Sequence, residues 1–216
     1  MVRKISEIYA EYKIMPNLQE HMLRVAAVAS LICDNFNEPL PKEDIITACL
    51  LHDMGNIIKS NLEYFPKFLE PEGLEYWQNV KREHANKYGF DEHKATAIIA
   101  GSIGLSNDII KIIDNFGFSN ATKNELGKLF SHKICNYSDE RVGPYGVMPM
   151  EGRILEGQKR YAGTKHSIAS GNFESLTKSL RNIEKQIFSR CKIKPEDITD
   201  ETIQPLLSEL REFVVK

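Results

Sequence analysis

The chain of 216 residues is long enough to bury the core of one large domain, or of one domain with an appendage. Because 28 lysines and arginines face 30 aspartates and glutamates, no overall basic field favours nucleic-acid binding. The four cysteines form no C-x-x-C pair, and neither a signal peptide nor a run of roughly 18 apolar residues is evident. These features predict a cytoplasmic globular protein without a membrane span.

Apolar residues recur at helical spacing in nearly every segment, which predicts an all-α protein. A short helix near residues 6–13 precedes a long one over 16–36, for which Asn17 is the expected N-cap. The next helix begins near Pro41 and stops at Gly55. Residues 57–71 mix aromatic residues and prolines without clean periodicity, so we expect a loop that forms one wall of a cleft.

The second half of the chain continues the helical pattern. Further helices are expected over 73–87, 91–102, 106–115 and 122–138, the last followed by Asp139. Residues 141–152 are rich in turn signals, and the tail from about Phe173 is again helical. We therefore expect a single domain over 1–216, with a motif-bearing core at about 15–150 and a helical extension at about 165–216.

The stretch LLHDMG places two ionisable residues, His52 and Asp53, at the end of an apolar helical run. Burying such groups costs free energy unless they are paired or coordinated. A core hydrogen bond, an acid–base pair and a metal ion remain open as explanations. His21 shares a helix face with Val25 and Val28, so it also points inward and can reach the same place from the neighbouring helix.

Three segments in order resemble the HD superfamily of metal-dependent phosphohydrolases, whose motif is H…HD…D on a helical bundle. The matching segments are HMLRVA, ACLLHDMGN and KICNYSDERVGPYG, and the resemblance covers about residues 15–150. It implies a bundle of roughly eight or more helices. It also implies that His21, His52, Asp53 and Asp139 bind a divalent cation.

Imidazoles and carboxylates suit Mn²⁺, Fe, Ni²⁺, Co²⁺ or Zn²⁺ better than Mg²⁺. Such an ion can lower the pKa of a bound water and polarise a phosphorus centre. The resemblance thus implies hydrolysis of a phosphomonoester or phosphoanhydride of a small molecule, with a nucleotide favoured as the substrate. Asp53 is the candidate for orienting or deprotonating the water. A homo-oligomer remains open.

Some members of this family bind a second metal through two further histidines. His93 fits the first of these positions, but Asn115 stands near the second, so one ion is favoured and a second stays possible. His93 is also a candidate for protonating the leaving group, and Lys59 for offsetting phosphate charge. Three residues are candidates for binding substrate. Arg24 lies one turn beyond His21, Arg141 lies two residues past Asp139, and His84 is a further histidine outside the motif.

Two alternatives belong to other functional classes. One is a regulatory module that binds a nucleotide without hydrolysing it. The other is an HD protein that performs oxygen chemistry at a di-iron centre, which requires ligands beyond the four motif residues. Tight nucleotide binding without metal-dependent turnover would favour the first, and mutation of His84 and His93 would test the second.

Overall fold

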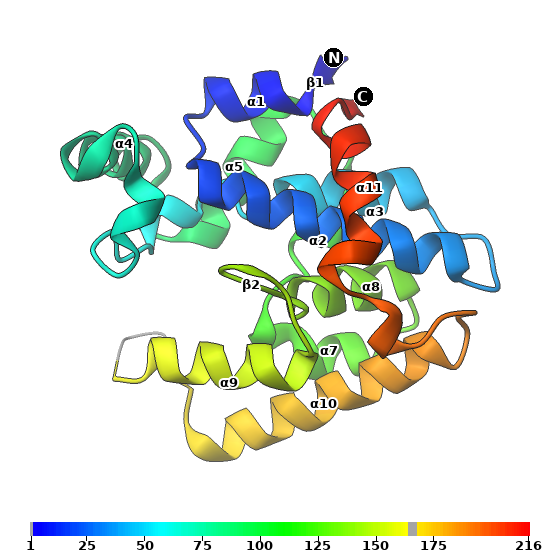
Figure 1. The fold of residues 1–216 in the computed structure, drawn as a ribbon. Helices are drawn as coiled ribbons and strands as arrows, with labels where there is room; N and C mark the ends of the chain where they lie inside the picture. The colour runs from blue at the N-terminus through cyan, green and yellow to red at the C-terminus, as the bar shows by residue number, and fades with distance from the viewer. Residues whose placement is uncertain (1, 164–167) are drawn as a thin grey trace.

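The structure is a computed structural model that describes residues 2–163 and 168–216, and it is built almost entirely from helices (Figure 1). In chain order the α-helices are α1 (Ile5–Glu11), α2 (Pro16–Asn35), α3 (Lys42–Leu51), α4 (Gly73–Tyr88), α5 (Glu92–Ile103), α6 (Asn107–Ile113), α7 (Ala121–Leu126), α8 (Phe130–Asp139), α9 (Met150–Tyr161), α10 (Ser170–Phe188) and α11 (Asp200–Arg211). The expectation of an all-α bundle with eight or more helices is confirmed.

Short elements connect these helices. The 3₁₀ helices are η1 (Asn56–Ile58), η2 (Pro66–Leu69), η3 (Phe118–Asn120) and η4 (Pro195–Asp197). Two antiparallel strand pairs complete the described part of the chain: β1 (Arg3–Lys4) with β4 (Val214–Val215), and β2 (Val142–Gly143) with β3 (Gly146–Val147). Within the described residues, no helix combines the length and apolar character needed to cross a membrane.

Helix α2 lies at the centre of the bundle and packs against α3, α8 and α11 (Figure 1). Residues 25–29 of this helix, VAAVA, are all 0% exposed. Three alanines in this short run let neighbouring helices approach closely, and the burial of every side chain means that partners surround it. His21 sits one turn before this segment and is therefore held in a fixed position.

The two helices that carry the HD motif begin and end differently from the sequence-based expectation. The N-cap of α2 is Met15 rather than Asn17, because Pro16 takes the first helical position, where its fixed φ is suitable and its missing N–H costs nothing. Helix α3 ends at Leu51, before the expected stop at Gly55. His52 and Asp53 consequently lie in the turn that leaves the helix.

This turn packs directly against the start of α5. A Cβ atom on Gly55 would lie 2.4 Å from the carbonyl oxygen of Glu92 and 2.8 Å from Cβ of Ala95. The backbone N–H of Gly55 donates a hydrogen bond of 2.9 Å to Oγ1 of Thr96. Glycine is required here by close approach of two backbones, and this contact fixes the turn that carries His52 and Asp53.

The structure corrects two expectations in the second half. The helix expected over 122–138 is divided into α7 and α8, because Gly127 caps α7 with an extended backbone (φ −66°, ψ 159°). Helix α9 begins inside the segment expected to be turn-rich, directly after Pro149. The expected start of the extension near residue 165 lies outside the described residues, but α10 and α11 confirm its helical character.

Candidate metal centre

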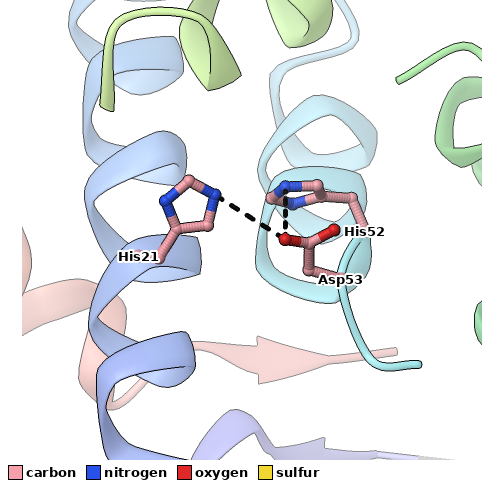
Figure 2. Close-up of side chains that lie close together, drawn as sticks. All are labelled: His21, His52 and Asp53. Carbon is pink, nitrogen blue, oxygen red and sulfur yellow. Dashed lines mark ion pairs between the residues drawn. The ribbon is translucent and has the colours of Figure 1, made fainter. Parts of the chain in front are cut away.

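Two helices bring His21, His52 and Asp53 together (Figure 2). His21 projects from α2, and the other two follow the end of α3. Oδ2 of Asp53 lies 3.8 Å from Nε2 of His21 and 3.7 Å from Nε2 of His52. One ligand atom from each residue lies within 4.8 Å of the others, a spacing that can hold a metal ion.

Helix α8 brings Asp139 to the same place. Its Oδ1 lies 3.1 Å from Nε2 of His21 and 3.5 Å from Nε2 of His52. Asp139 is the last residue of α8, which packs against both α2 and α3. The four residues that the sequence motif singles out are thus assembled from three helices that share one core.

His52 has the hydrogen-bonding pattern of a metal ligand. Its Nδ1–H donates a 2.8 Å bond to the carbonyl oxygen of Cys49, so the lone pair of the neutral ring is on Nε2. The ring stacks on Phe116 with centroids 4.3 Å apart and planes at 15°, which fixes its orientation. Nε2 is buried without a hydrogen-bond partner among the described residues. A buried polar atom in this state is costly unless something coordinates it, so the residues fit a cation.

The electrostatics of the cluster also favour positive charge. Burial acts to raise the pKa of Asp139, but the hydrogen bond from His21 and the charge of both histidines more than offset it and hold that pKa well below its usual range. Burial acts to lower the pKa of His52, yet the carboxylates of Asp53 and Asp139 raise it to about 9. Two carboxylates in one buried site therefore favour a bound cation.

The cluster opens into a cavity of about 430 Å³, within the size range of sites that hold small-molecule ligands. The loop over 57–71 forms one wall, as expected from the sequence, through Leu62, Tyr64, Phe65 and Phe68. The β2–β3 hairpin borders the cavity through Val142, Gly143 and the intervening Pro144, and contacts both α2 and α9 (Figure 1).

Two of the other predicted site residues line this cavity. Lys59 has a side chain that is 20% exposed, and its Nζ lies 3.6 Å from Oε1 of Glu92. His93 stands at the first turn of α5, which Asp91 caps, and its side chain is 70% exposed. The side chain of Lys59 thus extends into the cavity, whereas the side chain of His93 lies at the cavity rim.

The three residues expected to bind substrate are not among the described residues that line the cavity. Arg24 lies half-buried on α2. His84 is buried, and its Nε2–H donates a 2.9 Å bond to the carbonyl oxygen of Tyr12. Arg141 is buried as well and donates to the carbonyl oxygens of Met148, Pro195 and Ile198. The structure thus gives His84 and Arg141 bonds that hold the fold together.

Helix α9 contributes three cavity residues that lie outside the sequence motif, Arg153, Arg160 and Tyr161. The two arginines are seven positions apart in RILEGQKRY, so they lie on one face of the helix, two turns apart. That spacing is a signal in the sequence, but it lies beyond the motif and beside a segment rich in turn residues. Phe116, which stacks on His52, was also missed, because a single aromatic residue in sequence does not differ from a core residue.

The position expected for a second metal is taken up by packing. The side-chain Nδ2 of Asn115, in the turn after α6, donates a 2.6 Å bond to the carbonyl oxygen of Lys111 in that helix, and Asn115 is buried. Within residues 2–163 and 168–216, the group formed by His21, His52 and Asp53 is the one that meets the spacing of a metal site. One ion remains the favoured prediction.

The fold and the site together define an all-α protein with a histidine–aspartate candidate metal centre at the base of a cavity. A family model for the HD domain matches residues 18–128. The chain belongs to the HD domain family. Comparison with curated proteins and with solved structures gives no match. The matched segment contains His21, His52 and Asp53, and it ends before Asp139 and α9.

Proposed function

We propose that the protein is a metal-dependent phosphohydrolase that acts on a phosphomonoester or phosphoanhydride of a small molecule, with a nucleotide as the favoured substrate. The observation that carries this proposal is the unpartnered, buried Nε2 of His52, which faces two carboxylates at the base of a cavity of ligand size. Family membership supports the same class of reaction.

We infer that His21, His52, Asp53 and Asp139 hold one divalent cation, and that Mn, Fe, Ni, Co and Zn are the metals that suit this donor set. When bound, the cation would polarise a phosphoryl group and lower the pKa of a neighbouring water. Nδ2 of Asn56 donates a 2.6 Å bond to Oδ2 of Asp53 and thereby orients this carboxylate.

The chain's own side chains would divide the remaining work. Asp53 would orient or deprotonate the attacking water, since its carboxylate lines the cavity and is held by Asn56. Lys59 would offset negative charge on the phosphoryl oxygens. His93, at the rim, is the candidate for protonating the leaving group.

The aromatic wall supports a substrate with a planar ring. Tyr64, Phe65 and Phe68 form consecutive ring contacts, with centroids 4.7 Å and 5.1 Å apart, and all three line the cavity. Such surfaces accept nucleobases by stacking. By contrast, Trp77, which is also aromatic and near in sequence, is 3% exposed and belongs to the core.

The test is phosphate release by Mn²⁺-loaded protein from a panel of nucleotides and sugar phosphates. We expect turnover of at least one nucleotide, and a loss of at least about 100-fold in Asp53→Ala. His132→Ala serves as the control, because this histidine of α8 is not among the residues that line the cavity. Tight nucleotide binding with no turnover would instead establish the regulatory function.

A further inference from the structure

We propose that Arg153, Arg160 and Lys59 form a second anion subsite in the cavity, which binds the additional phosphates of a ligand with two or more consecutive phosphate groups. This inference rests on the proposed function and narrows its substrate class to phosphoanhydrides such as nucleoside diphosphates and triphosphates.

The first support is the position of the three cations. All three line the same cavity as the HD residues. Their side chains are mostly buried, with 13% of Arg153, 22% of Arg160 and 20% of Lys59 exposed. Buried cations are rare unless they are paired or serve a ligand, and here Glu92 pairs with Lys59 while a single carboxylate, Glu156, pairs with both arginines.

The second support is how the guanidinium groups are held. Nη1 of Arg153 lies 3.2 Å from Oε2 of Glu156, and Nε of Arg160 lies 3.0 Å from Oε1 of the same carboxylate. Nε of Arg153 also donates a 2.9 Å bond to the carbonyl oxygen of Val142 in the hairpin. Glu156 is not among the residues lining this cavity, so it pairs with both arginines from outside the cavity lining. Each guanidinium has five N–H donors, and these contacts leave others for an anion.

The three cations act through directed donors rather than through an excess of charge. Asp53 and Asp139 are the carboxylates among the described residues that line the cavity, and a divalent cation would match their charge. Glu92 pairs with Lys59 and Glu156 with both arginines from outside the lining, and Glu140 is a further negative charge near Arg153. The N–H donors that remain on the guanidinium groups are therefore what would bind a further phosphate group.

The cations also lie within the electrostatic field of the HD residues. Burial acts to lower the pKa of Lys59, but the carboxylates of Asp53, Glu92 and Asp139, with the phenol of Tyr161, raise it overall. Burial acts to lower the pKa of Arg153 as well, but the carboxylates of Glu140, Asp139 and Glu156 raise it overall. A ligand that spans from the metal centre to these cations would therefore bridge groups that already interact.

The experiment is calorimetric titration of metal-free protein with inorganic pyrophosphate and with orthophosphate. We expect pyrophosphate to bind about tenfold tighter, because it reaches more of the charged donors. Arg153→Gln and Arg160→Gln should each weaken pyrophosphate binding about tenfold and change orthophosphate binding less. Equal affinity for the two anions, or an unchanged pyrophosphate affinity in both variants, would overturn the proposal.

The matched control is Arg181→Gln, which breaks an arginine–glutamate pair between α10 and α9, because Nε of Arg181 lies 2.6 Å from Oε1 of Glu151. It should leave both affinities unchanged. If Arg153→Gln does not fold once its bond to the hairpin is lost, Arg160→Gln carries the test, since Arg160 forms its ion pair with Glu156 of the same helix. Circular dichroism of each variant separates loss of folding from loss of binding.

A second arm separates this inference from the proposed function. In Mn²⁺-loaded protein, Arg160→Gln should lower kcat/KM for a nucleoside triphosphate more than for the monophosphate. If no substrate is hydrolysed but pyrophosphate binding still depends on Arg160, the proposed function fails and the anion subsite stands. If nucleotides are hydrolysed with the same preference in wild type and variant, and pyrophosphate binding is unaffected, the subsite fails and the phosphohydrolase stands.

Discussion

Gly55 follows the histidine–aspartate pair, and we expect its replacement to disturb the candidate metal centre by steric means. In Gly55→Ala the new methyl group would lie 2.4 Å from a backbone oxygen of Glu92, which cannot move as a side chain can. We predict a loss of about 1–3 kcal/mol in the free energy of unfolding, measured by urea denaturation, because this site is overpacked by the added methyl.

Gly101→Ala is the control for this substitution. Gly101 lies on the exposed side of α5, and a Cβ atom there meets nothing within 4 Å. Because alanine favours the helix over glycine, this variant should be as stable as wild type or more stable by up to about 1 kcal/mol. A Gly55→Ala protein as stable as wild type would contradict the packing described for the turn.

His84 should make the stability of the fold depend on pH. Burial lowers its pKa from the reference value of 6.5, and its Nε2–H donates to the carbonyl oxygen of Tyr12. The unfolded chain therefore binds the proton more readily, so the contribution of His84 is complete above about pH 6.5 and is lost as the pH falls below it. We predict that unfolding free energy measured from pH 7 to pH 5 falls less steeply in His84→Gln.

In this variant the glutamine amide can still donate to Tyr12, but it does not titrate. A pH dependence that is equal in wild type and His84→Gln would show that the folded and unfolded states bind this proton equally, contrary to the burial of the ring. His132→Gln is the comparison variant, because it removes a histidine of α8 that is less buried than His84.

At the residue level, the sequence predicted which residues form the candidate metal centre, but not how the residues beside it are placed. His21, His52, Asp53 and Asp139 come together because apolar spacing fixes which face of each helix turns inward. Arg141 is only two positions from Asp139, yet it points to the C-terminal segment. Proximity in sequence does not determine the direction of a long side chain, so substrate-binding residues could not be predicted in this way.

Among the connecting elements, the β2–β3 hairpin borders the cavity and is joined by hydrogen bonds to the C-terminal segment, so we expect its position to depend on these bonds. Arg141 donates to Met148 at the end of the hairpin and to the carbonyl oxygens of Pro195 and Ile198. Oδ1 of Asp200 accepts a 3.0 Å bond from the backbone N–H of Val147. The extension thus helps to hold the hairpin beside the candidate metal centre.

We predict that Arg141→Lys lowers the free energy of unfolding by about 2–4 kcal/mol, because lysine cannot replace several directed guanidinium bonds and leaves buried carbonyl oxygens unpaired. Chemical denaturation measures the change. Arg190→Lys is the control: its Nη1 pairs with Glu38 at the surface, so the loss should stay below about 1 kcal/mol. Similar losses in the two variants would show that Arg141 does not hold the hairpin.

At this scale the sequence predicts long elements better than short ones. Helices α2, α4 and α5 follow clear apolar periodicity, whereas α9 was missed because Pro149 and the glycines at 152 and 157 resemble turn signals. Proline is well suited to a helix start, and tertiary packing overrides the cost of the two glycines. The division between α7 and α8 was missed because Gly127 alone interrupts an otherwise helical pattern.

On the scale of the whole molecule, the two ends of the chain meet. Arg3 pairs with Val215 and Lys4 with Val214 in a short antiparallel ladder. Helices α10 and α11 pack on α7, α8 and α2, so the extension covers the helices that carry His21 and Asp139. We therefore predict one cooperative unfolding transition, in which the calorimetric and van't Hoff enthalpies agree. Two separated transitions would mean that the extension is a domain of its own.

The measurement that tests the account most directly is metal content after loading with Mn²⁺ and removal of free ions. We predict about one ion per chain in wild type, near-complete loss in Asp53→Ala and in His21→Ala, and retention in His93→Ala, whose side chain is exposed at the rim. A wild-type protein that retains no metal, or an Asp53→Ala protein that retains as much as wild type, would contradict the proposed metal centre.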